Sequence, residues 1–113
     1  MTAQLHHVAL NTAHFEESVR FFEMLFEMEV SRTAGEKPSR MLWFRQGIQI
    51  NEVIDSNSTG NRYDHVGIQV PDWQATRRRA AEMGCIPVEG KPHWFVTPEG
   101  VVIELKESSA RVK

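Results

Sequence analysis

The sequence has little that would suit an oxidising or membrane environment. Cys85 is its single cysteine, so no disulfide can form within the chain. No apolar run approaches the roughly 18–20 residues that a membrane span needs. The first residues also lack the charged and apolar segments of a signal peptide. We therefore expect a cytoplasmic protein with no membrane partner.

The chain also lacks a charge excess of either sign. It has 13 basic and 15 acidic side chains, a net charge of −2, which argues against a dedicated nucleic-acid binder. Its 113 residues, 41% hydrophobic and 25% charged, are typical of a single globular domain that buries its own core. We therefore expect one domain over residues 1–113, with a small molecule as its partner.

The first half of the chain predicts a strand, a helix and three further strands. Residues 5–12 are apolar and β-branched, which favours a strand. Phe15, Val19, Phe22 and Phe26 recur at the spacing of one helix face. Three strands are then predicted, over residues 28–33, 40–44 and 48–54.

The second half repeats this order after a polar, glycine-containing linker over residues 55–62. Residues 63–70 predict a strand, and a helix follows from residue 71 to residue 83, ended by Gly84. Three strands are then predicted, over residues 86–89, 93–97 and 101–106. The order therefore predicts two βαβββ units, over about residues 4–54 and 63–107.

Matching residues support an internal duplication. Residues 7–10 (HVAL) align with residues 65–68 (HVGI), and Phe15 aligns with Trp73. After a short gap, Trp43 aligns with Trp94, and residues 47–51 align with residues 100–104. We predict an α+β fold in which the two repeats pair their sheets and curl them about a shared concavity.

The duplication selects candidate metal ligands. His7 and His65 occupy equivalent first-strand positions, and the last-strand position holds Asn51 in one repeat and Glu104 in the other. Two imidazoles and one carboxylate suit an open zinc site or the facial triad of an Fe(II) enzyme, and Mn, Ni and Co are also compatible. The structural alternative is two hydrogen-bonded strand histidines and a solvated carboxylate. Since Glu104 lies in an apolar strand, burying it would be costly unless it is paired or metal-bound.

Other polar residues are predicted around this set. Asn51 is a weaker metal donor, so we assign it to substrate binding, with direct metal contact, contact through another residue or a water, and a purely structural role as the alternatives. Asn11 and Gln69 lie four residues after the two histidines and are candidates for substrate contact, with a hydrogen-bonded structural role as the alternative. His93 is the candidate catalytic acid or base, or a hydrogen-bond donor, and the sequence leaves open which face of its strand it occupies. His6 should point to the opposite strand face from its neighbour.

Structural roles are predicted for the remaining conspicuous residues. Core packing is expected for Trp43 and Trp94, a solvated helix face for residues 77–79 (RRR), and a buried apolar position for Cys85.

The segments LHHVALNT, SVRFFEMLFEMEV, DHVGIQV and TPEGVVIEL resemble the vicinal oxygen chelate superfamily. This group includes glyoxalase I, methylmalonyl-CoA epimerase, extradiol dioxygenases and fosfomycin-resistance enzymes. The resemblance implies a glyoxalase-like curled mixed sheet with a central cavity, a homodimer, and a divalent metal held by His7, His65 and Glu104. Asn51 falls where glyoxalase I has glutamate and the epimerases have glutamine, which departs from both patterns.

Two functions follow as hypotheses. The first is a metal-dependent enzyme that uses the cation as a Lewis acid on a small vicinal-oxygen or carbonyl substrate, as a lyase, isomerase or dioxygenase. The second is a ligand-sequestering protein of the bleomycin-resistance type. Such proteins generally lack the metal residues, so the three candidate ligands favour the enzyme. The fosfomycin enzymes carry threonine where this chain has Ala9. The substrate, the metal, and whether the site forms within one chain or across a dimer are left open.

Overall fold

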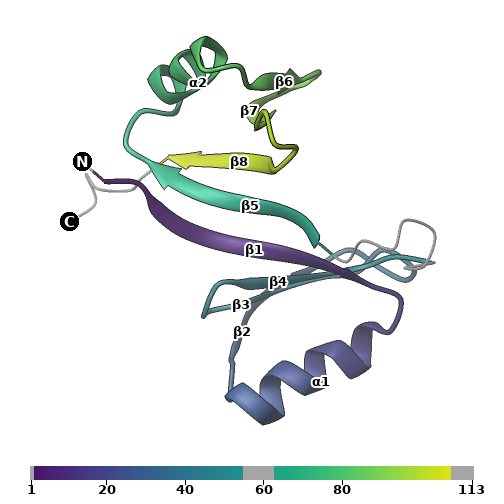
Figure 1. The fold of residues 1–113 in the computed structure, drawn as a ribbon. Coiled ribbons are helices and arrows are strands. Elements are labelled where there is room, and N and C mark those ends of the chain that lie inside the picture. The colour runs from purple at the N-terminus through teal and green to yellow at the C-terminus, as the bar shows by residue number, and fades with distance from the viewer. Residues whose placement is uncertain (1, 55–62, 108–113) are drawn as a thin grey trace. The chain divides into compact units, whose positions relative to one another are not determined.

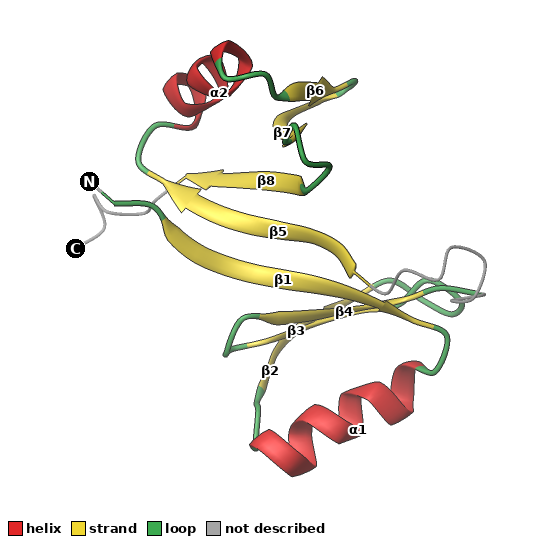
Figure 2. Ribbon diagram, viewed as in Figure 1, coloured by secondary structure: helices red, strands yellow, loops and turns green. Residues whose placement is uncertain are grey.

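The computed structural model describes residues 2–54 and 63–107, so the predicted linker lies outside the described residues. Helices and strands follow the predicted order (Figures 1 and 2). They are β1 (Gln4–Thr12), α1 (Phe15–Phe26), β2 (Val30–Ala34), β3 (Met41–Phe44), β4 (Ile48–Glu52), β5 (Tyr63–Val70), α2 (Trp73–Glu82), β6 (Ile86–Val88), β7 (Lys91–Val96) and β8 (Val102–Glu107). No helix in this part of the chain is long and apolar enough to cross a membrane.

The described residues form two compact units. Residues 7–54 and 63–64 make up the N-terminal unit, and residues 2–6 and 65–107 make up the C-terminal unit. The strand order is β2-β3-β4-β1 in the first and β6-β7-β8-β5 in the second. In each, the first strand is parallel to the last strand of its repeat, and the other pairs are antiparallel. This confirms the α+β fold built from two βαβββ repeats.

In the N-terminal unit, α1 covers one face of the strands. Leu42, Phe44 and Ile50 are buried on that face, and Phe15 and Phe22 of the helix pack against them. The helix carries these aromatic residues on one side, as their spacing predicts. Since strand side chains alternate, the odd-numbered residues of β4 must point to the other face.

In the C-terminal unit, α2 covers the equivalent face. Its core is formed by Val70, Ala80, Phe95 and Leu105, and half-buried Cys85 packs against it, consistent with its predicted apolar role. The helix begins at Asp72, whose carboxylate accepts a hydrogen bond from the Ala75 backbone N–H at 3.1 Å. Arginine residues 77–79 are exposed, which confirms the predicted solvated face.

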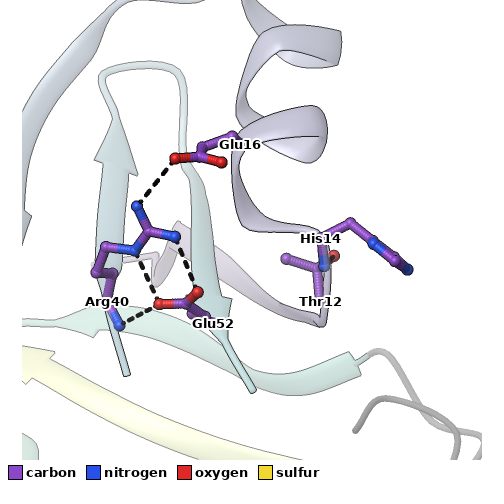
Figure 3. Close-up of polar contacts among 5 residues, drawn as sticks. All are labelled: Thr12, His14, Glu16, Arg40 and Glu52. Atoms are coloured by element: carbon purple, nitrogen blue, oxygen red, sulfur yellow. Dashed lines mark hydrogen bonds and ion pairs between the residues drawn. The ribbon is translucent and has the colours of Figure 1, made fainter. Parts of the chain in front are cut away.

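A bidentate ion pair fastens α1 to the strands of the N-terminal unit (Figure 3). The Arg40 guanidinium donates to both carboxylate oxygens of Glu52, at 2.8 and 2.9 Å, and reaches Glu16 of α1 at 3.4 Å. It also lies 4.5 Å from the ring centroid of Phe15. The hydrogen bonds from Arg40 lower the pKa of Glu52 from 4.5 to about 2. His14 points away from this cluster in the same view.

Candidate functional site

In each unit, the strand face that does not carry the helix collects the polar residues; we call it the helix-free face. In the N-terminal unit, β1 and β4 are in parallel register, with Ala9 opposite Gln49 and Asn11 opposite Asn51. On the other side of β4, Trp43 lies opposite Gln49. Directly opposed residues share a face. His7 therefore lies on the helix-free face together with these residues.

The C-terminal unit has the same arrangement. Gly67 of β5 and Trp94 of β7 both lie opposite Glu104 of β8, and Gln69 lies opposite Lys106. His65 shares this face, because it is two residues from Gly67. The helix-free face of the C-terminal unit thus carries two of the three predicted metal ligands.

The side chains of these two predicted ligands, His65 and Glu104, approach each other closely. Nε2 of His65 lies 3.1 Å from Oε1 of Glu104, and the two side chains are only 5% and 20% exposed. The ring of Trp94 closes one side, with its centroid 4.5 Å from that of His65. Lys106 Nζ approaches the second carboxylate oxygen of Glu104 at 4.0 Å. An imidazole nitrogen and a carboxylate oxygen at this separation form the donor set that a borderline divalent cation accepts.

His7 is the buried histidine of the N-terminal unit, at 5% exposure, whereas its neighbour His6 is exposed. This confirms that the two adjacent histidines point to opposite strand faces. On its own unit's helix-free face, His7 occupies the position that His65 occupies in the C-terminal unit.

The register corrects the sequence alignment of the last strands. Gln49 lies between Ala9 and Trp43, just as Glu104 lies between Gly67 and Trp94. Gln49, and not Asn51, is therefore the repeat equivalent of Glu104. The connection before β4 spans residues 45–47 and the one before β8 spans residues 97–101, so the second is two residues longer. The sequence alignment placed its gap elsewhere and missed this residue.

Asn51 and Asn11 lie in a chain of side-chain amides. Gln49 Nε2 donates to Asn51 Oδ1 at 2.8 Å, Asn51 Nδ2 donates to Asn11 Oδ1 at 3.3 Å, and Asn11 Nδ2 donates to Asp64 Oδ1 at 3.3 Å. Two of the three predicted substrate-binding residues are thus brought together with the residue equivalent to Glu104. The third, Gln69, is half-buried on the helix-free face of the C-terminal unit.

His93 is placed differently from its predicted site role. The acid–base hypothesis left open which face this strand position occupies, and the register settles it: Trp94 is opposite Glu104, so His93 faces α2. Its ring stacks on Trp73, with centroids 3.8 Å apart and planes tilted by 31°. Within the C-terminal unit, the structure therefore does not bring His93 to the side of His65 and Glu104.

The two repeat-equivalent tryptophans also differ from expectation. Both lie on helix-free faces and not with the buried core residues. Each has a cation against its ring: Arg32 at 3.9 Å from the Trp43 centroid and Lys91 at 4.9 Å from the Trp94 centroid. Core packing was therefore the wrong prediction for both. The duplication itself was the available signal, since it places them beside the equivalent ligand positions.

Comparisons with known proteins give one sequence relative and several structural ones. A metapyrocatechase from Geobacillus stearothermophilus is 33% identical over 113 aligned positions, which cover 91% of this chain and 34% of that protein. The chain thus spans about a third of the length of the curated relative it matches. No family model matches the sequence.

Solved structures show the same fold at low sequence identity. A protein designated BH1468 from Bacillus halodurans has a TM-score of 0.71 at 15% identity, with 96% of both chains covered. A methylmalonyl-CoA epimerase bound to methylmalonyl-CoA has a TM-score of 0.68 at 17% identity, with 97% of both covered. The epimerase from Mycobacterium tuberculosis has a TM-score of 0.67 at 18% identity, covering 96% of this chain and 89% of that one.

Proposed function

We propose that this chain, which belongs to the vicinal oxygen chelate superfamily, holds one divalent cation with His7, His65 and Glu104. Each of the three offers one ligand atom of a type that zinc and iron accept. The proposal is carried by the 3.1 Å approach of His65 to Glu104, two largely buried groups.

Gln49 is the proposed fourth residue of this site. It is buried, at 6% exposure, and the strand register gives it the place that Glu104 has in the other repeat. Glutamine at this place is the pattern that the resemblance assigns to the epimerases. With Gln49 at this place, the chain no longer departs from the epimerase pattern, and this match supports an isomerase.

The proposed activity is Lewis-acid chemistry on a small substrate with vicinal oxygens or a carbonyl group. A bound cation would polarise these oxygens and stabilise negative charge that develops on them. The chain's own residues would supply two imidazoles, one amide and one carboxylate, so the cation with its ligands carries one net positive charge. Such a site favours anionic oxygen ligands. Homology to metapyrocatechase favours a dioxygenase, and Gln49 favours an isomerase or lyase.

Metal content after purification tests the proposal. We expect the parent protein to carry about one divalent ion per chain and His65→Ala to lose it, because one of the three ligands is removed. His6→Ala is the matched control, since this exposed neighbour of His7 should retain the metal. Equal metal in the parent and His65→Ala would reject the enzyme hypothesis and favour the ligand-sequestering alternative. Oxalate should bind only to the metal-loaded protein.

A homodimer is the second part of the proposal. On α1, Met24 is 74% exposed, Leu25 is 59% exposed and Phe21 is 52% exposed. These residues share one side of the helix, and exposed apolar groups of this kind mark association surfaces. We expect a dimer by sedimentation, converted to a monomer by Leu25→Lys and unaffected by Glu23→Lys. A monomeric parent protein at about 100 μM would contradict this.

A further inference from the structure

The amide chain of the N-terminal unit ends on a group that can only accept hydrogen bonds. An ionised carboxylate has no hydrogen to donate, whereas an amide can present either its oxygen or its NH₂ group. Asp64 therefore requires Asn11 to present its NH₂ group. Asn11 then presents its oxygen to Asn51, and Asn51 presents its oxygen to Gln49.

This reasoning fixes the orientation of the last amide. Because Gln49 donates from Nε2 to Asn51 at 2.8 Å, its remaining polar atom is Oε1. A cation is bound by the amide oxygen and repelled by the amide NH₂ group. Outer-shell partners of this kind orient metal ligands, and losing one typically weakens metal binding by about 10- to 100-fold.

We propose that Asp64, acting through Asn11 and Asn51, is a positioning residue that holds Gln49 with its amide oxygen directed at the cation. Asp64 and Asn51 touch neither the cation nor the substrate in this role. In the C-terminal unit, Glu104 has a charged neighbour, Lys106. In the N-terminal unit, the neutral amide of Asn51 takes the corresponding place beside Gln49. The metal-binding part of this inference rests on the proposed function, whereas the direction of the chain does not.

The direction of the chain is tested in the metal-free protein by NMR of the side-chain amides. Asp64→Asn replaces the acceptor-only end with a group that can also donate, so the chain loses its fixed polarity. We expect the side-chain N–H signals of Gln49 to shift, although three amide hydrogen bonds separate it from residue 64. Asp72→Asn is the matched control, because Asn is an equally good helix cap. Unchanged Gln49 signals in Asp64→Asn would overturn the inference.

The role toward the cation is tested by Co²⁺ binding, followed by visible absorption and by titration. Asn51→Leu removes the acceptor that holds Gln49, and we expect Co²⁺ affinity to fall about 10-fold. Asn51→Asp keeps an acceptor for Gln49 Nε2, so it should bind Co²⁺ at least as tightly as the parent. Equal affinities for Asn51→Leu and the parent would overturn the positioning role. Such a result would leave the three-ligand proposal standing, since that depends on His65→Ala.

Discussion

Replacing His93 provides the sharpest test of the site geometry, because the sequence and the register assign it different roles. The structure stacks its ring on Trp73 at 3.8 Å, on the face that carries α2. A stacked aromatic pair contributes about 0.5–1.5 kcal/mol beyond burial. His93 is half-buried, so loss of burial adds a part of the 1.5–3 kcal/mol of a fully buried apolar side chain. We expect His93→Ala to lose about 1–2 kcal/mol of unfolding free energy.

For a domain of 113 residues, this loss lowers Tm by about 4–8 °C. His93→Phe keeps a ring against Trp73 and cannot transfer protons, so its Tm should stay within about 2 °C of the parent. Thermal unfolding measures both Tm shifts, urea unfolding measures the loss of free energy, and metal content should be unaltered in each variant. Equal stability of His93→Ala and the parent would refute the stacking argument. Loss of metal from a stable His93→Phe would refute the placement of His93 away from Glu104.

Three further predictions concern the core, acid stability and the charge beside the site. Ile50 is 1% exposed, so Ile50→Ala should lose about 2–5 kcal/mol of unfolding free energy and Ile50→Val about 0.5–1.5 kcal/mol. Equal losses of the two variants in urea unfolding would contradict the burial of Ile50. The pKa of Glu52 is lowered to about 2 by Arg40, so this carboxylate contributes stability above its unfolded pKa of about 4.5 that is lost as the pH falls through 2. Glu52→Gln should flatten that part of the acid-unfolding curve, and a curve parallel to the parent's would argue against the ion pair. Lys106→Met removes the ammonium group beside Glu104 and should strengthen Co²⁺ binding by less than about 10-fold, with a larger effect at low salt. Weaker Co²⁺ binding in this variant would contradict the placement of Lys106 beside Glu104.

The fold was predictable because each element has its own local signal. Apolar and β-branched composition predicted β1, and the aromatic spacing predicted α1. The boundary errors have local causes. Met28 was assigned to a strand, but its backbone N–H bonds to the Phe22 carbonyl after Glu27 turns left-handed, with φ of 56°, so it still belongs to the helix end. The seventh strand was predicted to begin at residue 93, yet the pairing of Val88 with Lys91 extends β7 back to Lys91.

The two histidines of the candidate site were predictable because the duplication fixes their positions without gaps, and Glu104 was predictable as a carboxylate in an apolar strand. His7 and His65 lie before any length difference between the repeats, so their equivalence could be read directly. Gln49 lies after the connections of unequal length, and its match to Glu104 needs the strand pairing. The amide chain could not be predicted either. Asp64 directly precedes His65, but the first repeat has no aspartate at the equivalent position, so the duplication gave no signal for it.

The two repeats place different residue types at the proposed ligand position and at the position two residues beyond it. On β4, the amide of Gln49 is held by Asn51, two residues further along the same face. On β8, the carboxylate of Glu104 is approached by Lys106, again two residues further along. In each repeat, therefore, the proposed ligand position and the residue that approaches it lie on one strand and share one face, which a duplicated sequence preserves even when the residue types diverge. In the proposed metal site, a neutral pair in one repeat and an ionic pair in the other would present little negative charge to the cation, which would leave a net positive centre for an anionic oxygen ligand.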